Sequence, residues 1–157
     1  MSTLLLRFAG PMQAWGADSR FDVCRTNREP TKSGVIGLLA AALGWRRDAP
    51  LDDLEALQFG VRVDREGVLL RDFHMVRSAK TAYVTTRYYL CDAVFLTGVF
   101  SEDEALMQRL AEAVSHPAFP LFLGRRACPP EGRVFLGLRE EADARAQSSV
   151  SANHGPK

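Results

Sequence analysis

The 157-residue sequence lacks the features that mark several large classes of protein. It has no apolar run of the roughly 18 residues that a membrane-spanning helix needs. Its first residues have neither the basic region nor the long apolar region of a signal peptide. No unit of about 20–50 residues repeats along the chain, which argues against a solenoid or propeller. We therefore expect a cytoplasmic protein that does not contact a membrane.

Cysteine is scarce. The three cysteines, Cys24, Cys91 and Cys128, are far apart and form no C-x-x-C pair. An odd number at such spacings argues against both a disulfide framework and a cysteine-based zinc site. We interpret all three as free thiols, buried or partly exposed, and expect neither a metal nor another cofactor.

Motifs of known catalytic sites are also missing. The sequence contains no G-x-S-x-G and no H-E-x-x-H. A metal-independent endoribonuclease needs a general base, a general acid and a cation, and His74, Lys80 and Tyr83 are the candidates for these roles. An enzyme of this kind remains the alternative hypothesis to a protein that only binds its ligand.

Charge is nearly balanced overall, at +1, but it is unevenly distributed. Residues 1–47 contain seven Lys or Arg and three Asp or Glu, and residues 71–90 contain four and one. Residues 48–66 have the opposite balance, two against six. Such segregation can produce a basic face on a neutral protein, as nucleic-acid binding requires, although solvated loop charge would give the same pattern.

Apolar periodicity predicts two helices. Positions 35, 38, 39, 42 and 43 have the spacing of a buried helix face. Thr31 or Ser33 can cap the start of this helix, and Gly44 stands where a glycine often ends one. Ser101 as N-cap and Glu104 at the third helical position have the spacing of a capping box and predict the second helix.

Six β-prone runs predict strands, and the turn-rich residues 64–67 indicate that the second and third runs form a hairpin. The strands are expected at Thr3–Phe8, Leu57–Val63, Val68–Val76, Tyr83–Leu90, Ala93–Phe100 and Arg133–Leu138. When the run at 83–90, which leads into the run at 93–100, is counted with it, the order is β-α-β-β-β-α-β. This order contains the βαββαβ plan of an α+β, ferredoxin-like (RRM-like) fold, with one extra strand or ribbon. We assign residues 1–138 to this domain and residues 139–157 to a polar tail.

Four short segments suit a nucleic acid. In Gly10–Gly16, Trp15 either stacks on a base or covers the edge of the core, and Gln13 can bond a base edge or a backbone carbonyl. The helix start Pro30–Gly34 offers backbone N–H groups, hydroxyls and Lys32 to a phosphate. It is not a nucleotide-hydrolysing P-loop, because the glycine follows the lysine.

The other two segments combine arginine with aromatic residues or glycine. Strand alternation over Thr85–Tyr89 places Arg87 and Tyr89 on one face and Tyr88 on the other. Basic and aromatic side chains interleaved in this way suit single-stranded RNA, although a partly exposed strand would look the same. In Gly124-Arg125-Arg126, glycine allows close approach to another chain and the arginines can fork onto phosphates.

Five blocks of the sequence, taken together, resemble the CasD-type subunits of type I-E Cascade, members of the RAMP superfamily. The blocks are LRFAGPMQAWG, PTKSGVIGLLAAALGWRRDAP, VRVDREGVLLRDFHMV, TTRYYLCDAVF and PLFLGRRACPP, at residues 6–16, 30–50, 61–76, 85–95 and 120–130. They occur in order and span residues 4 to about 138.

The resemblance implies a RAMP domain in a CRISPR surveillance complex that serves antiviral defence. Its partners would be the crRNA, the backbone RAMP subunits and the large subunit. Its role would be to hold the 5′ handle of the crRNA without cutting it, and so to cap that end of the complex. The related type I-C proteins do cut CRISPR repeat RNA, but their catalytic residues have no clear match here. The expected RNA-binding residues are Gln13, Trp15, Arg20, Thr31, Lys32, Ser33, Arg77, Arg87, Tyr88, Tyr89, Arg125 and Arg126.

The chain departs from this family in two places. Family members usually have a long "thumb" hairpin between the DFH and TTRYYL blocks, whereas residues 76–84 are too few for one. They also have a longer region after the GRR block, of which we interpret the polar tail as a remnant. Steps that depend on a thumb, such as kinking the guide, are therefore in question.

Overall fold

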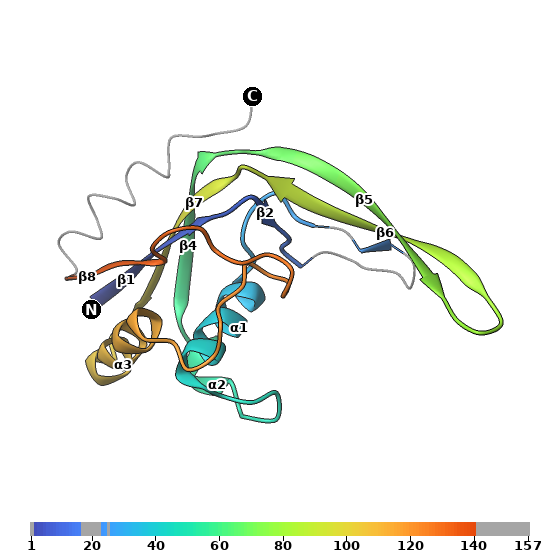
Figure 1. Cartoon of the computed structure of the whole chain (residues 1–157). Helices are drawn as coiled ribbons and strands as arrows, with labels where there is room; N and C mark the ends of the chain where they lie inside the picture. The colour runs from blue at the N-terminus through green and yellow to red at the C-terminus, as the bar shows by residue number, and fades with distance from the viewer. Residues whose placement is uncertain (1, 17–22, 25, 141–157) are drawn as a thin grey trace.

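A four-stranded antiparallel sheet forms the centre of the molecule (Figure 1). The computed structural model describes residues 2–16, 23–24 and 26–140. The strand order is β4-β7-β1-β8. The four strands are β1 (Ser2–Ala9), β4 (Gln58–Arg65), β7 (Val94–Ser101) and β8 (Phe135–Glu140).

Helices α1 (Lys32–Leu43) and α3 (Glu104–Ser115) cover one face of this sheet, and the short α2 (Asp52–Glu55) precedes β4 (Figure 1). The chain order β1-α1-β4-β7-α3-β8 and the sheet order together form the βαββαβ arrangement of a ferredoxin-like fold. This confirms the predicted fold class. No helix among the described residues is long and apolar enough to cross a bilayer.

Strand alternation builds the core beneath the helices. On β1, Leu4, Leu6 and Phe8 have no exposed surface, and on β7 Phe95 and Val99 are buried in the same way. Side chains two residues apart lie on the same face of a strand, so these residues form one apolar layer. The helices complete it. Val35, Leu38, Leu39 and Ala42 are buried at the predicted positions of the first helix, and Ile36, Met107, Leu110 and Val114 are buried with them.

The first helix has the predicted ends. The Thr31 hydroxyl accepts a hydrogen bond from the Gly34 N–H at 3.2 Å. Gly44 ends the helix in the left-handed conformation, with φ of 78°. Its N–H bonds the carbonyls of Ala40 and Ala41, which satisfies groups that a helix end leaves without a partner.

The predicted capping box of the second helix is wrong. Asp103, not Ser101, is the N-cap, and its carboxylate accepts from the Leu106 N–H at 3.1 Å. Glu104 is the first helical residue, and it accepts a hydrogen bond from the Ser2 hydroxyl at 2.6 Å. The carboxylate of Asp103 is the stronger acceptor, because a charged oxygen at a helix N-terminus also interacts with the helix dipole.

Replacing this cap gives a first prediction. Asp103→Ala is expected to lower the free energy of unfolding by about 1 kcal/mol, since the Leu106 N–H loses its acceptor. Asp103→Asn keeps an acceptor and should cost clearly less. Urea unfolding of the two variants measures the difference, and equal loss in both would show that the side chain does not cap α3.

The second sheet is built around β6 (Ala82–Cys91). It pairs with β5 (Val68–Arg77) on one side, and with the two-residue strands β2 (Met12–Gln13) and β3 (Val23–Cys24) on the other. β3 runs parallel to β6, whereas β2 and β5 are antiparallel to it.

The predicted hairpin between the strands before and after residues 64–67 is also wrong. β4 pairs with β7 in the central sheet, and β5 pairs with β6 in the second sheet. The turn therefore carries the chain from one sheet to the other. Gly67 lies against this crossing, where an added Cβ would stand 2.6 Å from the Cys91 carbonyl oxygen. Local turn chemistry predicts that the chain turns, but tertiary contacts decide which strand it meets.

β5 and β6 form a long arm that projects from the body (Figure 1). Their register runs from Val68 opposite Cys91 to Arg77 opposite Ala82. The interval between the DFH and TTRYYL blocks is short, as the sequence indicated, because the blocks themselves supply both strands of the hairpin. The prediction that this chain has too few residues here for a long hairpin is therefore wrong, because β5 and β6 pair over ten residues at this place.

Candidate nucleic-acid interface

Trp15 and Gln13 lie inside the core, with no exposed surface. The Gln13 amide donates to the carbonyls of Phe8 and Ala93, at 3.2 and 2.8 Å, and accepts from the Trp15 indole N–H at 3.0 Å. The hypothesis that Trp15 stacks on a base and Gln13 reads a base edge is therefore wrong for this structure. Both side chains are fully hydrogen-bonded structural groups, as the alternative interpretation had it.

Trp15 joins three segments of the chain. Its ring lies 5.2 Å from that of Phe8, and an added Cβ on Gly34 would stand 2.7 Å from its indole carbon. Its backbone carbonyl accepts from the Asn27 N–H at 2.8 Å, and its own N–H donates to the Thr26 hydroxyl at 2.8 Å. The indole therefore holds the start of α1 against β1.

Gly124 packs the Gly124-Arg125-Arg126 segment against the backbone next to Trp15. Its φ is 88°, and an added Cβ would stand 1.6 Å from the Ala14 carbonyl oxygen. The Leu123 carbonyl accepts from the Ala14 N–H at 3.1 Å. The close approach that we expected toward another chain is thus made within this chain, to Ala14, the residue before Trp15. This contact fixes the backbone position from which Arg125 extends.

Arg125 reaches from this loop to the second sheet. Its guanidinium carbon lies 5.3 Å from the centre of the Tyr89 ring, and its Nη1 donates to the Tyr88 carbonyl at 3.3 Å. Stacking of this kind holds the guanidinium in one orientation. Tyr89 itself is buried, with 3% of its surface exposed, so it supports Arg125 and is not free to stack on a base.

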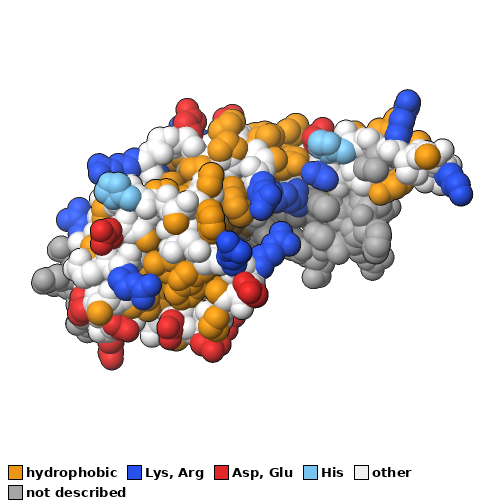
Figure 2. Space-filling view, turned by 60° about the horizontal axis from the view of Figure 1, so that its bottom comes forward, with side chains coloured by type: hydrophobic (Ala, Val, Ile, Leu, Met, Phe, Trp, Pro, Cys, Tyr) orange, Lys and Arg blue, Asp and Glu red, His pale blue; other side chains and the backbone are white. Residues whose placement is uncertain are grey.

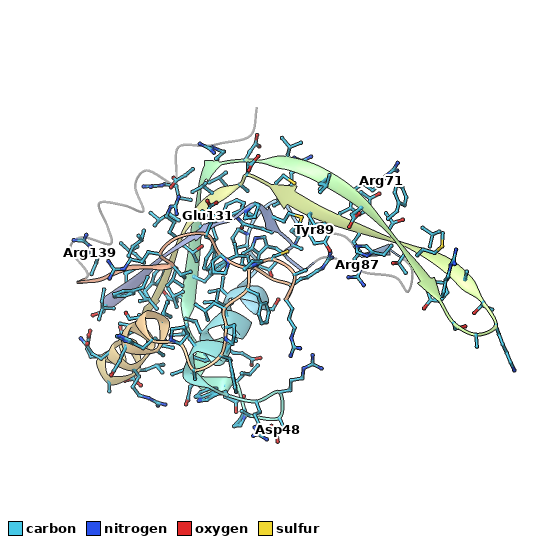
Figure 3. The ribbon with its side chains drawn as sticks, in the orientation of Figure 1. Asp48, Arg71, Arg87, Tyr89, Glu131 and Arg139 are labelled. Carbon is cyan, nitrogen blue, oxygen red and sulfur yellow. The ribbon has the colours of Figure 1, made fainter. Side chains whose placement is uncertain are left out.

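Arg87 lies two residues before Tyr89 on the same face of β6, as the sequence predicted (Figure 3). It is half-buried, and its Nε is buried with no hydrogen-bond partner among the described residues. A buried guanidinium nitrogen without a partner costs free energy, unless a ligand supplies an acceptor. Tyr88 lies on the other face of β6, where its partner across the strand pair is Arg71.

The start of α1 contributes hydroxyls and one lysine. Thr31 is half-buried, whereas Lys32 and Ser33 are exposed, and the Lys32 ammonium donates to the Glu55 carbonyl at 2.7 Å. Lys32 is thus tied to the end of α2. The Ser33 hydroxyl lies 3.4 Å from that of Thr31, beside the positive end of the helix dipole.

These contacts bring separate parts of the sequence together. Gly34 touches Trp15, Gly124 touches Ala14, and Arg125 touches Tyr89 on β6. Figure 2 shows Lys and Arg side chains gathered where the arm meets the body. We call the set Lys32, Arg87, Arg125 and Arg126 the basic junction; Arg126 is exposed beside Arg125.

One expected arginine, Arg77, lies far from the basic junction. Arg77 ends β5, six residues along the strand from Arg71, which is about 20 Å at the usual rise per residue. It also points to the opposite face of the arm from Arg87. Arg20 lies outside the described residues.

His74, Lys80 and Tyr83 all lie on the outer half of the arm. The His74 Nε2 is 2.6 Å from a carboxylate oxygen of Asp72. Tyr83 is on the same face of the arm as His74, and Lys80 is in the turn between β5 and β6. All three side chains are exposed, and the second nitrogen of His74 is the one left for a proton transfer.

Cys91 and Cys128 show no sign of a reactive site. Cys91 and Cys128 are free, and burial raises the pKa of both thiols. A raised pKa leaves little thiolate near neutral pH. No three His, Cys, Asp or Glu side chains of the described chain are grouped closely enough to bind a metal ion.

Sequence reasoning missed the parts that position the basic junction. It did not foresee the Arg125–Tyr89 stack, because these two residues are distant in sequence and meet only in the folded chain. It also missed the Asp72–His74 pair, although strand alternation places residues two apart on the same face of β5. The two short strands β2 and β3 were missed as well. Their strand signals are too short to stand out from a loop.

The comparisons with known proteins agree with this architecture. Residues 3–155 match the family model described as CRISPR-associated protein (Cas_Cas5). The chain belongs to the Cas5 family. It is 41% identical to the CRISPR system Cascade subunit CasD of Escherichia coli (strain K12), over 90% of this chain and 73% of that protein.

Two solved structures resemble this family member. A chain of a CRISPR RNA-guided surveillance complex matches with a TM-score of 0.75 and 42% identity, over 84% of this chain. A crystal structure of a Cas protein matches with a TM-score of 0.69 and 48% identity, over 85% of this chain. The chain spans 61% and 62% of the lengths of these two proteins.

Proposed function

We propose that this chain is a non-catalytic CRISPR RNA-binding subunit of a Cascade-type surveillance complex in the cytoplasm. It holds the 5′ handle of the guide RNA and caps the backbone of RAMP subunits, next to the large subunit. The similarity to the Cascade subunit CasD supports this assignment. The single structural observation that carries it is the stacking of Arg125 on Tyr89, which lies on the same face of β6 as Arg87 where the arm leaves the body.

The chemistry of the basic junction suits an RNA backbone. Arg87 has an Nε that lacks an acceptor, and a phosphate oxygen can supply one. Arg125, oriented by the Tyr89 ring, adds a second positive charge beside it. The Ser33 hydroxyl and the positive end of α1 offer a second place for a phosphate. Lys32 first has to leave the Glu55 carbonyl, which makes it the weaker contact.

Binding without cleavage fits the outer half of the arm. His74 is paired with Asp72 on an exposed strand, in the outer half of the arm. A general base has to lie within hydrogen-bonding reach of the hydroxyl that it activates, near the cation that stabilises the transition state. We therefore assign His74 to the structure of the arm.

The basic junction can be tested by its contribution to RNA affinity. The double variant Arg87→Ala/Arg125→Ala is expected to bind handle RNA about 30- to 100-fold more weakly at physiological salt, because two charge-assisted contacts are lost. The slope of log K against log salt should become shallower by about 1.4, the value for two phosphate contacts on a single strand. Filter binding of labelled RNA to the full chain, or to the reconstituted complex, measures both.

The matched control removes two arginines elsewhere. Arg46 and Arg47 are exposed and follow the far end of α1, about 18 Å from Lys32 for a helix of this length. Arg46→Ala/Arg47→Ala lowers the net charge equally and should leave affinity within about twofold. Equal losses in the two double variants would show that total charge, not the basic junction, determines binding. Cleavage of labelled repeat RNA in EDTA that disappears with His74→Ala would contradict the non-catalytic assignment.

A further inference from the structure

The outer edge of β5 has no strand beside it in the part of the chain that the structure describes. β5 pairs with β6 over ten residues, and its other side forms the border of the arm (Figure 1). An unpaired edge presents a row of backbone N–H and C=O groups that can pair with another chain. Proteins usually protect such edges with proline, bulges or short length, and β5 has a continuous register and no proline.

The turn at the end of the arm determines which groups point outward. The Ser78 N–H donates to the Thr81 carbonyl at 2.7 Å, so these two residues form a hydrogen-bonded pair. Pairs alternate along an antiparallel ladder, and Arg77–Ala82 is therefore not hydrogen-bonded to β6. The N–H and C=O groups that point away from β6 belong to Leu69, Arg71, Phe73, Met75 and Arg77.

The side chains of the same five residues lie on one face of the arm. Phe73 and Met75 are 57% and 62% exposed, and Val84 beside Met75 is 51% exposed. The Arg71 guanidinium carbon lies 4.8 Å from the centre of the Phe73 ring. The free edge is therefore bordered by an apolar strip, with arginines on either side of it.

A two-stranded arm with exposed apolar residues is incompletely packed. β3 pairs with β6 at two positions, Val23 with Thr86 and Cys24 with Arg87. Beyond Thr86, β5 and β6 are the only strands of the arm among the residues that the structure describes. An isolated pair of strands is only marginally stable in water. A third strand on β5 would satisfy the outward N–H and C=O groups and cover part of the apolar strip at once.

We propose that the outer edge of β5 binds an extended segment of a protein subunit, which adds a strand to the arm. This inference rests on the proposed function, because it places the chain in a protein–RNA complex. The added strand would have apolar residues beside Phe73 and Met75, and a carboxylate beside Arg71 or Arg77. Strand addition of this kind obtains affinity from main-chain hydrogen bonds and specificity from alternate side chains.

An RNA strand fits this edge less well. Phosphate oxygens only accept hydrogen bonds, whereas the edge alternates N–H donors with C=O acceptors at the two-residue repeat of a strand. A protein strand has the same repeat and both kinds of group. Phe73, Met75 and Val84 are also apolar, and the arginines that favour RNA converge at the other end of the arm.

Hydrogen exchange of the assembled complex tests the proposal without any substitution. The complex is reconstituted from the full chain, guide RNA and partner subunits, and its exchange is compared with that of the isolated chain. Strand addition should slow exchange at least tenfold at the amides of Arg71, Phe73 and Met75, which point outward. Unchanged exchange at these amides in the complex would overturn the proposal, even if the Phe73 side chain became covered.

A pair of variants at one position separates main-chain from side-chain contact. Met75→Pro removes an outward N–H but no hydrogen bond to β6, and Met75→Ala keeps the N–H and removes the apolar side chain. We expect Met75→Pro to weaken incorporation into the complex at least tenfold, and Met75→Ala to weaken it about threefold. RNA affinity of the isolated Met75→Pro chain should stay at the wild-type value, which also shows that the variant is folded.

Other outcomes would identify another occupant. Normal incorporation of Met75→Pro would exclude strand addition while leaving the proposed function intact. Loss of RNA affinity in Met75→Pro, with unchanged protein assembly, would assign the edge to RNA. A concentration-dependent dimer of the isolated chain in sedimentation, abolished by Met75→Pro, would assign it to a second copy of this chain.

Discussion

Gly124→Ala is expected to lower the free energy of unfolding by at least about 3 kcal/mol, in the range reserved for core and backbone defects, or to leave the chain unable to fold. The Cβ would stand 1.6 Å from the Ala14 carbonyl oxygen, and a backbone atom cannot rotate out of the way. Its φ of 88° adds strain for any residue with a Cβ. Urea unfolding followed by circular dichroism measures the loss.

The effect should extend to RNA, because Gly124 sets the position of Arg125. A soluble fraction of Gly124→Ala that still unfolds cooperatively is expected to bind handle RNA more weakly than the wild type. Gly37 provides the control, since it lies exposed inside α1 and an added Cβ meets nothing within 4 Å. Gly37→Ala should raise the free energy of unfolding by about 0.5–1 kcal/mol. Gly124→Ala with wild-type stability would contradict the contact with Ala14.

Trp15→Ala is the second large effect, with an expected loss of about 3–5 kcal/mol. The substitution leaves a cavity between Phe8 and Gly34, and it removes the N–H that the Gln13 amide oxygen accepts. Both the start of α1 and the end of β1 lose a packing partner. Thermal or urea unfolding of the full chain measures the loss.

Trp15→Phe distinguishes the buried role from base stacking. Phenylalanine keeps an aromatic ring but leaves the buried Gln13 oxygen without its donor, which should cost about 1–3 kcal/mol. If Trp15 stacked on a base, this variant would instead keep its stability, because no buried donor would be lost, and it would also keep most of its RNA affinity, because phenylalanine stacks on bases as well. The structure predicts lower stability, with the RNA affinity of the folded fraction close to that of the wild type.

The difference between Trp15 and Arg125 shows how a family resemblance and a structure complement each other. Both residues belong to blocks that resemble the CasD-type subunits, and both were expected to contact RNA. Burial separates them, because Trp15 has no exposed surface whereas the guanidinium of Arg125 lies over a ring where the arm leaves the body. Similarity between sequences identifies the residues that matter, but not whether they act in the core or on a ligand.

Local chemistry alone determined much of this protein. The periodicity of α1, its Thr31 cap and Gly44, and the alternation of β1 and β7 depend on neighbours a few residues away. These signals are enough to predict the βαββαβ order and the α+β class. They also place Arg87 and Tyr89 on one face of β6, since alternation is a property of any strand.

Only the tertiary structure decided which strands pair and which glycines are essential. β4 pairs with β7 and not with β5, since the chain passes from the central sheet to the second sheet in the turn that contains Gly67. Gly124 and Gly34 are required by the Ala14 carbonyl and the Trp15 indole, which are distant in sequence. Contacts between distant segments follow from packing the whole chain, and no local pattern records them. The basic junction and the free edge of β5 arise in the same way.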